Sequence, residues 1–210
     1  MNGLIELLKD KKHVIWDWNG TLLNDVDHAV TTVNRLLTVR GLPQIEKEYY
    51  RQVFEFPVIN YYKAIGFNFE RESFEDVSHE FVQLYMDGFH HCPLVFGAKD
   101  TLETIQALKI TQSILSAADQ ESLDVMVSHF ELKQYFSSVN GIENKFASSK
   151  IQKGMDLISS SSHGLSETVL IGDTEHDLEV GQHLGIDVVL VGHGHQCPTR
   201  LSRVHDKVIN

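Results

Sequence analysis

The stretch His13-Val14-Ile15-Trp16-Asp17-Trp18-Asn19-Gly20-Thr21-Leu22-Leu23 decides the fold that we expect for this chain. It opens as a short apolar run, which is typical of a buried strand, and then reaches Asp17 and Gly20-Thr21, where the chain must turn. In open α/β sheets, ligands bind where strands end, because successive strand ends converge on one crevice. An Asp after an apolar run is also typical of a solvated turn. Partners elsewhere in the chain must therefore decide its role.

The charge balance limits the partners that we expect. The chain has 210 residues with a net charge of −11, from 18 Lys and Arg against 29 Asp and Glu. An acidic chain without a basic cluster is a poor nucleic-acid binder, because binding the phosphate backbone requires Lys and Arg. No apolar run approaches the roughly 18 residues of a membrane span. We expect a small anionic ligand, handled locally through a metal ion, and a monomer or homodimer.

Cysteine usage and the first residues indicate a cytoplasmic protein. Cys92 and Cys197 lie far apart and match no metal-binding spacing, which suits a reducing compartment. Residues 1–12 carry two acids and do not resemble a signal peptide. The pairs His90-His91 and His193-Gly194-His195 lack the spacing of a zinc protease motif, so we interpret them as solvated or capping histidines.

A helical block follows the first strand. Asn24 and Asp25 are candidate helix caps for Val26–Arg40, which Gly41-Leu42-Pro43 ends. Further helix-spaced apolar patterns cover Glu46–Glu55, Val58–Ile65 and Phe74–Phe89. Residues 25–91 therefore form a predicted all-helical domain.

The remaining chain alternates strands with helices. The predicted strands are Ile110–Ser116, Ser138–Ile142, Thr168–Ile171 and Asp187–Val191; the predicted helices are Gly97–Lys109, Gln120–His129, Ile151–Ile158 and Leu178–Leu184. This alternation indicates an α/β fold with a parallel sheet covered on both faces. Residues 1–24 and 92–210 would form this core, with the helical domain inserted over one rim.

Four further residues have side chains that could take part in binding or catalysis. Ser116 ends a predicted strand beside Ala117, where a hydroxyl and backbone N–H groups could bind an anionic oxygen, although a turn or cap role is common there. Asp173 and Asp177 follow another strand at a spacing that allows both carboxylates to face one Mg²⁺ ion. An acidic helix start is the alternative for them. Lys150 enters a helix from a loop, where most lysines are solvated.

Together these residues make the chain similar to the haloacid dehalogenase-like hydrolase superfamily, near its phosphoglycolate phosphatase branch. Asp17-Trp18-Asn19-Gly20-Thr21 resembles the first motif, Asp-x-Asp-Gly-Thr; Ser116 matches the second, Lys150 the third and Gly172-Asp173-Thr174-Glu175-His176-Asp177 the fourth. Lys145 and Lys153 lie close enough to compete with Lys150. The resemblance implies a Rossmann-like core and makes the inserted helices a cap domain.

The resemblance also implies roles for single residues. Asp17 would attack phosphorus and form an aspartyl-phosphate. Mg²⁺ would be held by Asp17, Asp173 and the backbone carbonyl of Asn19, with Asp177 in support. Ser116, Ala117, Thr21 and Lys150 would lie around the phosphoryl group, and Lys150 would neutralise Asp17. The implied substrate is a small phosphorylated metabolite, and an acidic metal motif argues against a dehalogenase.

Asn19 departs from the family pattern. The phosphatases use an Asp here as acid and base, and losing such help typically costs about 10²- to 10⁴-fold in rate. Three alternatives are open. Activity is retained through water or another group, the substrate has a good leaving group such as an acyl phosphate, or the site binds without turnover. An engineered Asp-to-Asn exchange at position 19 is a further explanation. A phosphoryl-ligand binding protein and a phosphomutase are therefore alternative functions.

Residues of the helical block would set the substrate. The candidates for closing over the crevice are Arg51, Tyr61, Tyr62, Lys63 and Arg71, each with a solvated or packing role as the alternative. Residues 193–196 follow the last strong strand on the same rim, where we expect a plain loop.

Overall fold

The computed structural model describes residues 2–143 and 148–209. In these residues a parallel sheet has the strand order β3-β2-β1-β4-β5-β6, with β1 at the centre beside β2 and β4. Its strands are β1 (His13–Trp16), β2 (Thr111–Asp119), β3 (Ser138–Ile142), β4 (Thr168–Gly172), β5 (Asp187–Val191) and β6 (Val208–Ile209). The predicted parallel α/β core is confirmed.

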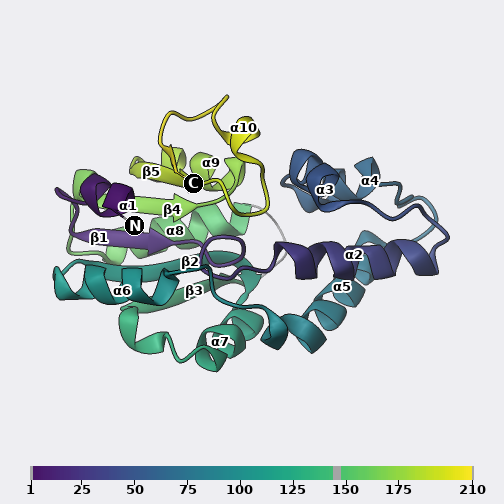
Figure 1. The fold of residues 1–210 in the computed structure, drawn as a ribbon, viewed down its shortest axis with the longest axis horizontal. Coiled ribbons are helices and arrows are strands. Elements are labelled where there is room, and N and C mark those ends of the chain that lie inside the picture. Colours follow the sequence, from purple (N-terminus) through teal and green to yellow (C-terminus); the bar gives the residue numbers. More distant parts are fainter. Residues whose placement is uncertain (1, 144–147, 210) are drawn as a thin grey trace.

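Helices cover both faces of this sheet (Figure 1). Alternate residues of β1 face opposite sides, because successive side chains of a strand point to opposite faces. Trp16 packs in the cluster formed with α1 (Asn2–Leu7), α6 (Ala98–Ala107) and α7 (Gln120–His129), whereas Ile15 packs with α8 (Ser148–Ser160), α9 (Glu175–Leu184) and α10 (Pro198–Leu201). The strand is thus buried on both sides.

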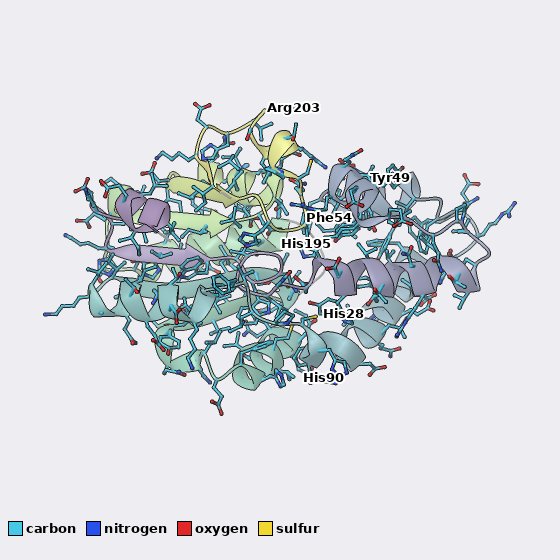
Figure 2. All side chains as sticks on the ribbon, viewed as in Figure 1. His28, Tyr49, Phe54, His90, His195 and Arg203 are labelled. Atoms are coloured by element: carbon cyan, nitrogen blue, oxygen red, sulfur yellow. The ribbon has the colours of Figure 1, made fainter. Side chains whose placement is uncertain are left out.

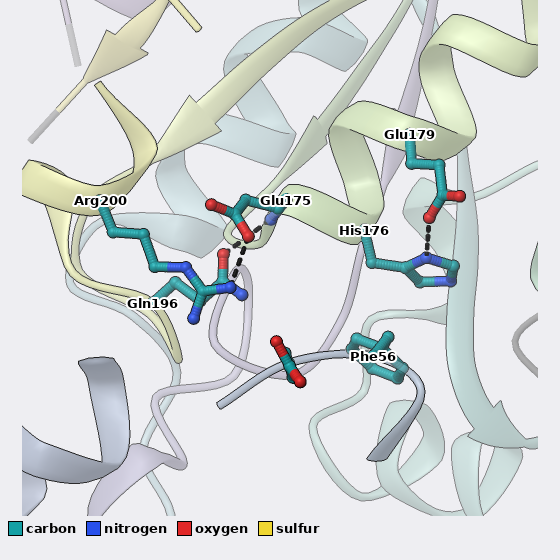
Figure 3. A pocket seen from close by; sticks show the side chains of 7 residues that line it. Phe56, Glu175, His176, Glu179, Gln196 and Arg200 are labelled. Atoms are coloured by element: carbon teal, nitrogen blue, oxygen red, sulfur yellow. Dashed lines mark hydrogen bonds and ion pairs between the residues drawn. The ribbon is translucent and has the colours of Figure 1, made fainter. Parts of the chain in front are cut away.

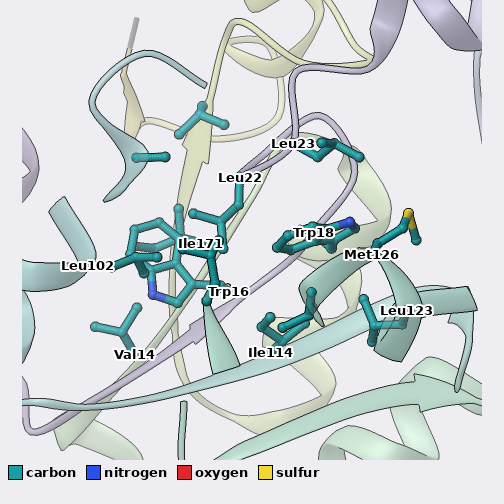
Figure 4. Packing of buried hydrophobic residues seen from close by; sticks show 14 of the residues in the cluster. Val14, Trp16, Trp18, Leu22, Leu23, Leu102, Ile114, Leu123, Met126 and Ile171 are labelled. Atoms are coloured by element: carbon teal, nitrogen blue, oxygen red, sulfur yellow. The ribbon is translucent and has the colours of Figure 1, made fainter. Parts of the chain in front are cut away.

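The two tryptophans of the opening stretch anchor one side of the core (Figure 4). Trp16 and Trp18 are 3% and 0% exposed and lie among Leu102, Ile114 and Met126. The indole N–H of Trp16 donates to Gln112 Oε1 at 3.0 Å, which satisfies its one polar atom. This packing fixes the backbone on either side of Asp17.

The helical block lies beyond the carboxyl ends of the strands (Figure 1) and has its own hydrophobic cluster. It consists of α2 (Val26–Val39), α3 (Lys47–Val53), α4 (Val58–Ala64) and α5 (Phe74–Gly88), followed by a short 3₁₀ turn, Phe89–His91. Leu36, Leu37 and Val77 are fully buried inside it. No helix within 2–143 or 148–209 has the length and hydropathy that a membrane crossing requires.

Several predicted element ends were wrong; helix α8, for example, begins at Ser148 instead of Ile151. Strand β2 continues to Asp119 instead of ending at Ser116, because its register with β3 shifts after Leu115 and Asp119 then pairs with Ile142. Helix α9 begins at Glu175 instead of Leu178, because the Thr174 side chain caps it. The short strand β6 carries no pattern that indicates it.

At the opposite end of β1 from Asp17, His13 makes stability depend on pH. Burial and the nearby His163 lower the pKa of His13 to about 4, and its Nδ1 lies 2.6 Å from Thr111 Oγ1. The unfolded chain gains a proton near pH 6.5 that the folded chain takes up only near pH 4. The contribution of His13 to the free energy of unfolding is therefore fully present above pH 6.5 and decreases as the pH falls below it. We expect a loss of about 2 kcal/mol between pH 7.5 and 5 from this group.

Urea unfolding of the wild type and of His13→Asn at both pH values measures this effect. The variant keeps a polar side chain but cannot titrate, so its free energy of unfolding should fall less over this interval. Equal pH dependence in both proteins would show that His13 is not the source.

Candidate active site

Asp17 lies directly after β1 and forms a buried ion pair. Its backbone N–H donates to Ile171 of the neighbouring strand β4 at 2.8 Å. Lys150 Nζ donates to Asp17 Oδ1 and to Asp177 Oδ1, each at 2.6 Å, and the lysine is 2% exposed. Residues 133 positions apart therefore meet at the carboxyl edge of the sheet.

Asp173 completes a group of three carboxylates with Asp17 and Asp177. Each offers an oxygen, and these atoms lie within 4.8 Å of one another. Asp173 accepts hydrogen bonds from Thr21 Oγ1 at 3.1 Å and from the backbone N–H of His195 at 2.5 Å. Hard cations such as Mg²⁺ prefer this kind of oxygen donor set.

Asp177 is the most firmly held of the three. Its Oδ2 accepts from the backbone N–H groups of Asp173 and Thr174, at 3.2 and 3.0 Å, and from the Thr174 hydroxyl at 2.7 Å. Its other oxygen accepts from Lys150. These bonds place Asp177 where it orients Lys150 and the start of α9.

The electrostatics of this cluster suit a divalent cation. Burial raises the pKa of Asp17 to about 6 despite Lys150, and Asp177 adds to the rise. Burial, together with Asp17 and Asp177, raises the pKa of Asp173 to about 8 although His195 opposes it. Three buried carboxylates thus share one lysine, and a bound cation would relieve their repulsion. The residues present fit a Mg²⁺ ion.

Lys150 and Asp177 stay charged because the attraction between opposite charges outweighs the effect of burial. Burial alone would lower the pKa of Lys150, but the carboxylates of Asp17 and Asp177 raise it. Burial would raise the pKa of Asp177, but the charge and the hydrogen bond of Lys150 lower it. The competitor Lys153 pairs instead with Glu143 at the surface at 2.5 Å, and Lys145 lies outside the described residues.

Ser116 reaches the same edge through strand pairing. Ile114 pairs with Trp16 of β1, so Ser116 lies beside the end of β1, at the irregularity of β2. Bulges are common next to active sites, where they redirect a side chain. Ser116 is 1% exposed, its Oγ accepts from the N–H of Ala118 at 3.1 Å, and Ala117 is partly exposed.

Asn19 takes part in a side-chain network that sequence analysis missed. Its Nδ2 donates to Asp25 Oδ2 and to Tyr85 Oη, each at 2.8 Å, and Tyr85 donates to Asp25 Oδ2 at 2.6 Å. Asp25 takes the predicted N-cap position of α2, but its side chain makes no capping bond to that helix and accepts from Gly20 N instead, at 2.7 Å.

His195 is buried in this network, so the expectation of a plain loop with a solvated or capping histidine was wrong for it. Its Nδ1 lies 2.7 Å from Tyr50 Oη, and its Nε2 lies 3.3 Å from Asp25 Oδ1, at ion-pair distance but out of line for a hydrogen bond. Burial opposes the charge, yet Asp25 and the two carboxylates Asp173 and Asp17 raise the pKa of His195 to about 9.

Asp25 is held ionised in return. Burial alone would raise its pKa, but the charge of the nearby His195 and hydrogen bonds from Tyr85 and Asn19 lower it. The only sequence signal for His195 was its place after a strand end.

Helix α3 is attached to the segment 192–200 of the core. Arg51 donates to the carbonyl groups of Gly192, Gly194 and Gln196, the second at 2.8 Å and the third at 3.1 Å. At the same seam Phe54 faces His195, with ring centroids 5.3 Å apart (Figure 2). Of the five candidates in the helical block, Arg51 therefore contacts the core.

Replacing Arg51 with Ala is expected to loosen this attachment. It removes three charge-assisted hydrogen bonds, and such bonds have a net worth of about 1.5–3 kcal/mol each. We expect faster amide hydrogen exchange in α3 and a lower Tm. Arg35→Ala, on the exposed face of α2, is the matched control and should change neither. Equal exchange in both variants would contradict the attachment.

The other candidates in the block have different roles. Tyr61 and Tyr62 are each 3% exposed and pack inside the block, so the packing alternative is confirmed for them. Lys63 and Arg71 are exposed. Cys92 and Cys197 are both free thiols.

A pocket opens at the seam between the helical block and the core (Figure 3). It has a volume of about 170 Å³ and is lined by Glu55, Phe56, Glu175, His176, Glu179, Gln196 and Arg200. Phe56 of the block stacks on His176 of α9, with ring centroids 4.6 Å apart. The residues next to Asp177 in sequence thus face a cavity that the block helps to form.

Comparisons with known proteins agree with this geometry. Residues 14–191 match the family model described as haloacid dehalogenase-like hydrolase. A search of curated protein sequences finds no match. Among solved structures, a haloacid dehalogenase-like hydrolase from Streptococcus pneumoniae is similar with a TM-score of 0.81 and 15% identity, over 95% of this chain and 93% of that one.

Two further solved structures share the fold at low identity. A proposed phosphoglycolate phosphatase from Lactobacillus delbrueckii subsp. bulgaricus has a TM-score of 0.73 and 16% identity, over 95% of this chain and 94% of that one. Protein Tyrosine Kinase A from Mycobacterium tuberculosis has a TM-score of 0.76 and 22% identity, over 90% and 88%. With the family model covering most of the sequence, the chain belongs to the haloacid dehalogenase-like hydrolases.

Proposed function

We propose that this hydrolase is a Mg²⁺-dependent phosphatase that hydrolyses small phosphorylated metabolites through an aspartyl-phosphate on Asp17. The observation that supports this most is the buried ion pair of Asp17 with Lys150, placed beside Asp173. It combines a nucleophilic carboxylate, a neutralising amine and oxygen donors for a metal in one place. Phosphoryl transfer depends mainly on such positioning and charge stabilisation.

The reaction divides into two displacements at phosphorus. First, a carboxylate oxygen of Asp17 bonds to phosphorus while the bond to the leaving oxygen breaks. An alkoxide leaving group then takes a proton from solvent, whereas the carboxylate of an acyl phosphate leaves as the anion. Then a water oxygen bonds to phosphorus, the bond to Asp17 breaks, and inorganic phosphate leaves. Lys150, Ser116 and the N–H of Ala117 bind the phosphoryl oxygens in this proposal.

The proposed metal site uses the same carboxylates. Asp17, Asp173 and the backbone carbonyl of Asn19 would hold Mg²⁺, and Asp177 would support it by orienting Lys150. When bound, the ion supplies positive charge that offsets the repulsion between the phosphoryl group and Asp17.

Asn19 narrows the substrate class. An amide has no titratable proton, and its Nδ2 donates to Asp25 and Tyr85. Leaving groups that need little protonation, such as the carboxylate of an acyl phosphate, therefore suit this site better than alkoxides. The same residue favours a second candidate, a phosphoryl-ligand binding protein without turnover; a phosphomutase is a further alternative.

The helical block would act as a cap domain, residues 25–91, over the core of residues 1–24 and 92–210. Its seam with the core holds the pocket beside α9, and closure there would exclude water during the first displacement. The proposal also includes a cytoplasmic location and a monomeric or homodimeric state. Composition and charge support the further proposal that the protein binds neither nucleic acid nor membranes.

Phosphate release from a panel of small phosphate esters and acyl phosphates, with and without Mg²⁺, tests the function. We expect release only with Mg²⁺, and faster release from acyl phosphates. Calorimetry with the same compounds separates the second candidate: Mg²⁺-dependent binding without release would support a binding protein, and neither release nor binding would overturn both.

A further inference from the structure

Asp25 is a buried carboxylate to which the proposed reaction gives no role. It is 1% exposed, and its Oδ1 accepts from the N–H of Gly20 at 2.7 Å and lies 3.3 Å from His195 Nε2. Its Oδ2 accepts from Asn19 and Tyr85. An Asp side chain at the N-cap position usually caps the helix that follows, whereas this one is directed at the loop that follows Asp17.

The side chains of residues 19, 25 and 85 form a closed triangle of three hydrogen bonds, in which only one assignment of donors and acceptors is possible. The amide of Asn19 donates to both Asp25 and Tyr85, and the hydroxyl of Tyr85 donates to Asp25. A carboxylate at position 19 has no proton to donate and would face the Asp25 oxygen at a distance near 2.8 Å. The triangle therefore needs a donor at position 19 as long as position 25 is a carboxylate.

The triangle also holds the backbone in a crowded part of the proposed metal site. Gly20 adopts a φ of +73°, and a Cβ there would lie 2.3 Å from Asp173 Oδ2. The bond from Gly20 N to Asp25 holds this backbone close against Asp173. Tyr85 comes from helix α5 of the block, so the same carboxylate also joins the loop to the block.

We propose that Asp25 is a positioning residue that carries, in place of residue 19, the carboxylate of this loop, and that it fixes Asn19 and Gly20 against the metal site and the helical block. The expected effects on kcat and KM rest on the proposed phosphatase function. It follows that Asn19→Asp alone lowers activity instead of restoring a general acid.

A double-mutant cycle tests this pairing. Asn19→Asp and Asp25→Asn each break the triangle, whereas the double variant reverses every donor and acceptor and keeps the net charge. We expect each single variant to lose at least about tenfold in kcat with little change in KM, and the double variant to recover most of this loss. Tm in metal-free buffer should follow the same pattern. Asn24→Asp, an exposed neighbour, is the matched control and should leave both unchanged.

The outcomes separate this inference from the proposed function. Recovery in the double variant supports the inference, and recovery of Tm alone in a protein that releases no phosphate supports the positioning while the phosphatase proposal fails. Additive losses, or an Asn19→Asp variant that is faster than wild type with unchanged Tm, overturn the inference. If the variants of the cycle do not fold, Tyr85→Phe decides, because it removes one hydroxyl: a loss of kcat at unchanged KM supports the inference and an unchanged kcat overturns it.

Discussion

Asp17→Asn is expected to abolish phosphate release, with kcat lower by at least about 10⁴-fold, as for other enzymes that lose a nucleophile. The amide is not nucleophilic, yet its Oδ1 can still accept the hydrogen bond from Lys150, so the ion-pair geometry is preserved. Initial rates with the best compound of the phosphate panel, at saturating Mg²⁺, measure the effect.

The fold should survive this substitution. Because burial raises the pKa of Asp17 to about 6, its charge opposes folding at pH 7.5, and a neutral Asn relieves its repulsion with Asp177 and Asp173. We expect Tm in metal-free buffer to be equal or higher. Asp10→Asn, an exposed exchange of the same kind, should change neither rate nor Tm. Residual activity within tenfold of wild type would show that another group attacks phosphorus.

Lys150→Ala is expected to damage both stability and activity. It leaves the buried carboxylates of Asp17 and Asp177 without their cation, and removing one partner of a buried pair costs about 3–5 kcal/mol. Loss of one charge-stabilising donor also lowers kcat by about 10²- to 10³-fold. Urea unfolding and initial rates measure the two effects.

Lys153→Ala provides the matched control on the same helix. Lys153 pairs with Glu143 at the surface, where the two side chains are 31% and 77% exposed, and such pairs are worth about 0–1 kcal/mol. We expect nearly wild-type stability and activity. Similar losses in both variants would mean that Lys150 has no special place in the site.

The sequence was informative wherever function depends on strand ends. The apolar run before Asp17 and the strand before Asp173 predict strands that prove to be neighbours, β1 and β4, and parallel strands bring their carboxyl ends to one edge. Lys150 contacts Asp17, the carboxylate that it is predicted to neutralise, and also Asp177, for which no contact was predicted. The roles of these residues in catalysis stay predictions until the experiments above are done.

The sequence was uninformative where the local pattern fits more than one role for a residue and only tertiary contacts decide between them. Asp25 has the residue type and position of a helix cap, and only the packing of Tyr85 and His195 around it turns its carboxylate elsewhere. The extension of β2 to Asp119 depends on a register shift against β3, which no local pattern encodes. The contact of Tyr85 with Asp25 joins residues 60 positions apart, beyond the reach of any local pattern.

The central claim is that Asp17 becomes phosphorylated during turnover. Acid quenching of the wild-type protein, mixed with Mg²⁺ and an acyl phosphate, followed by peptide mass spectrometry, tests it directly. The account predicts a peptide heavier by one phosphoryl group with the modification on Asp17, present with Mg²⁺ and absent in Asp17→Asn. Phosphate release from the compound without any phosphorylated peptide, or a phosphoryl group on another residue, would contradict the account.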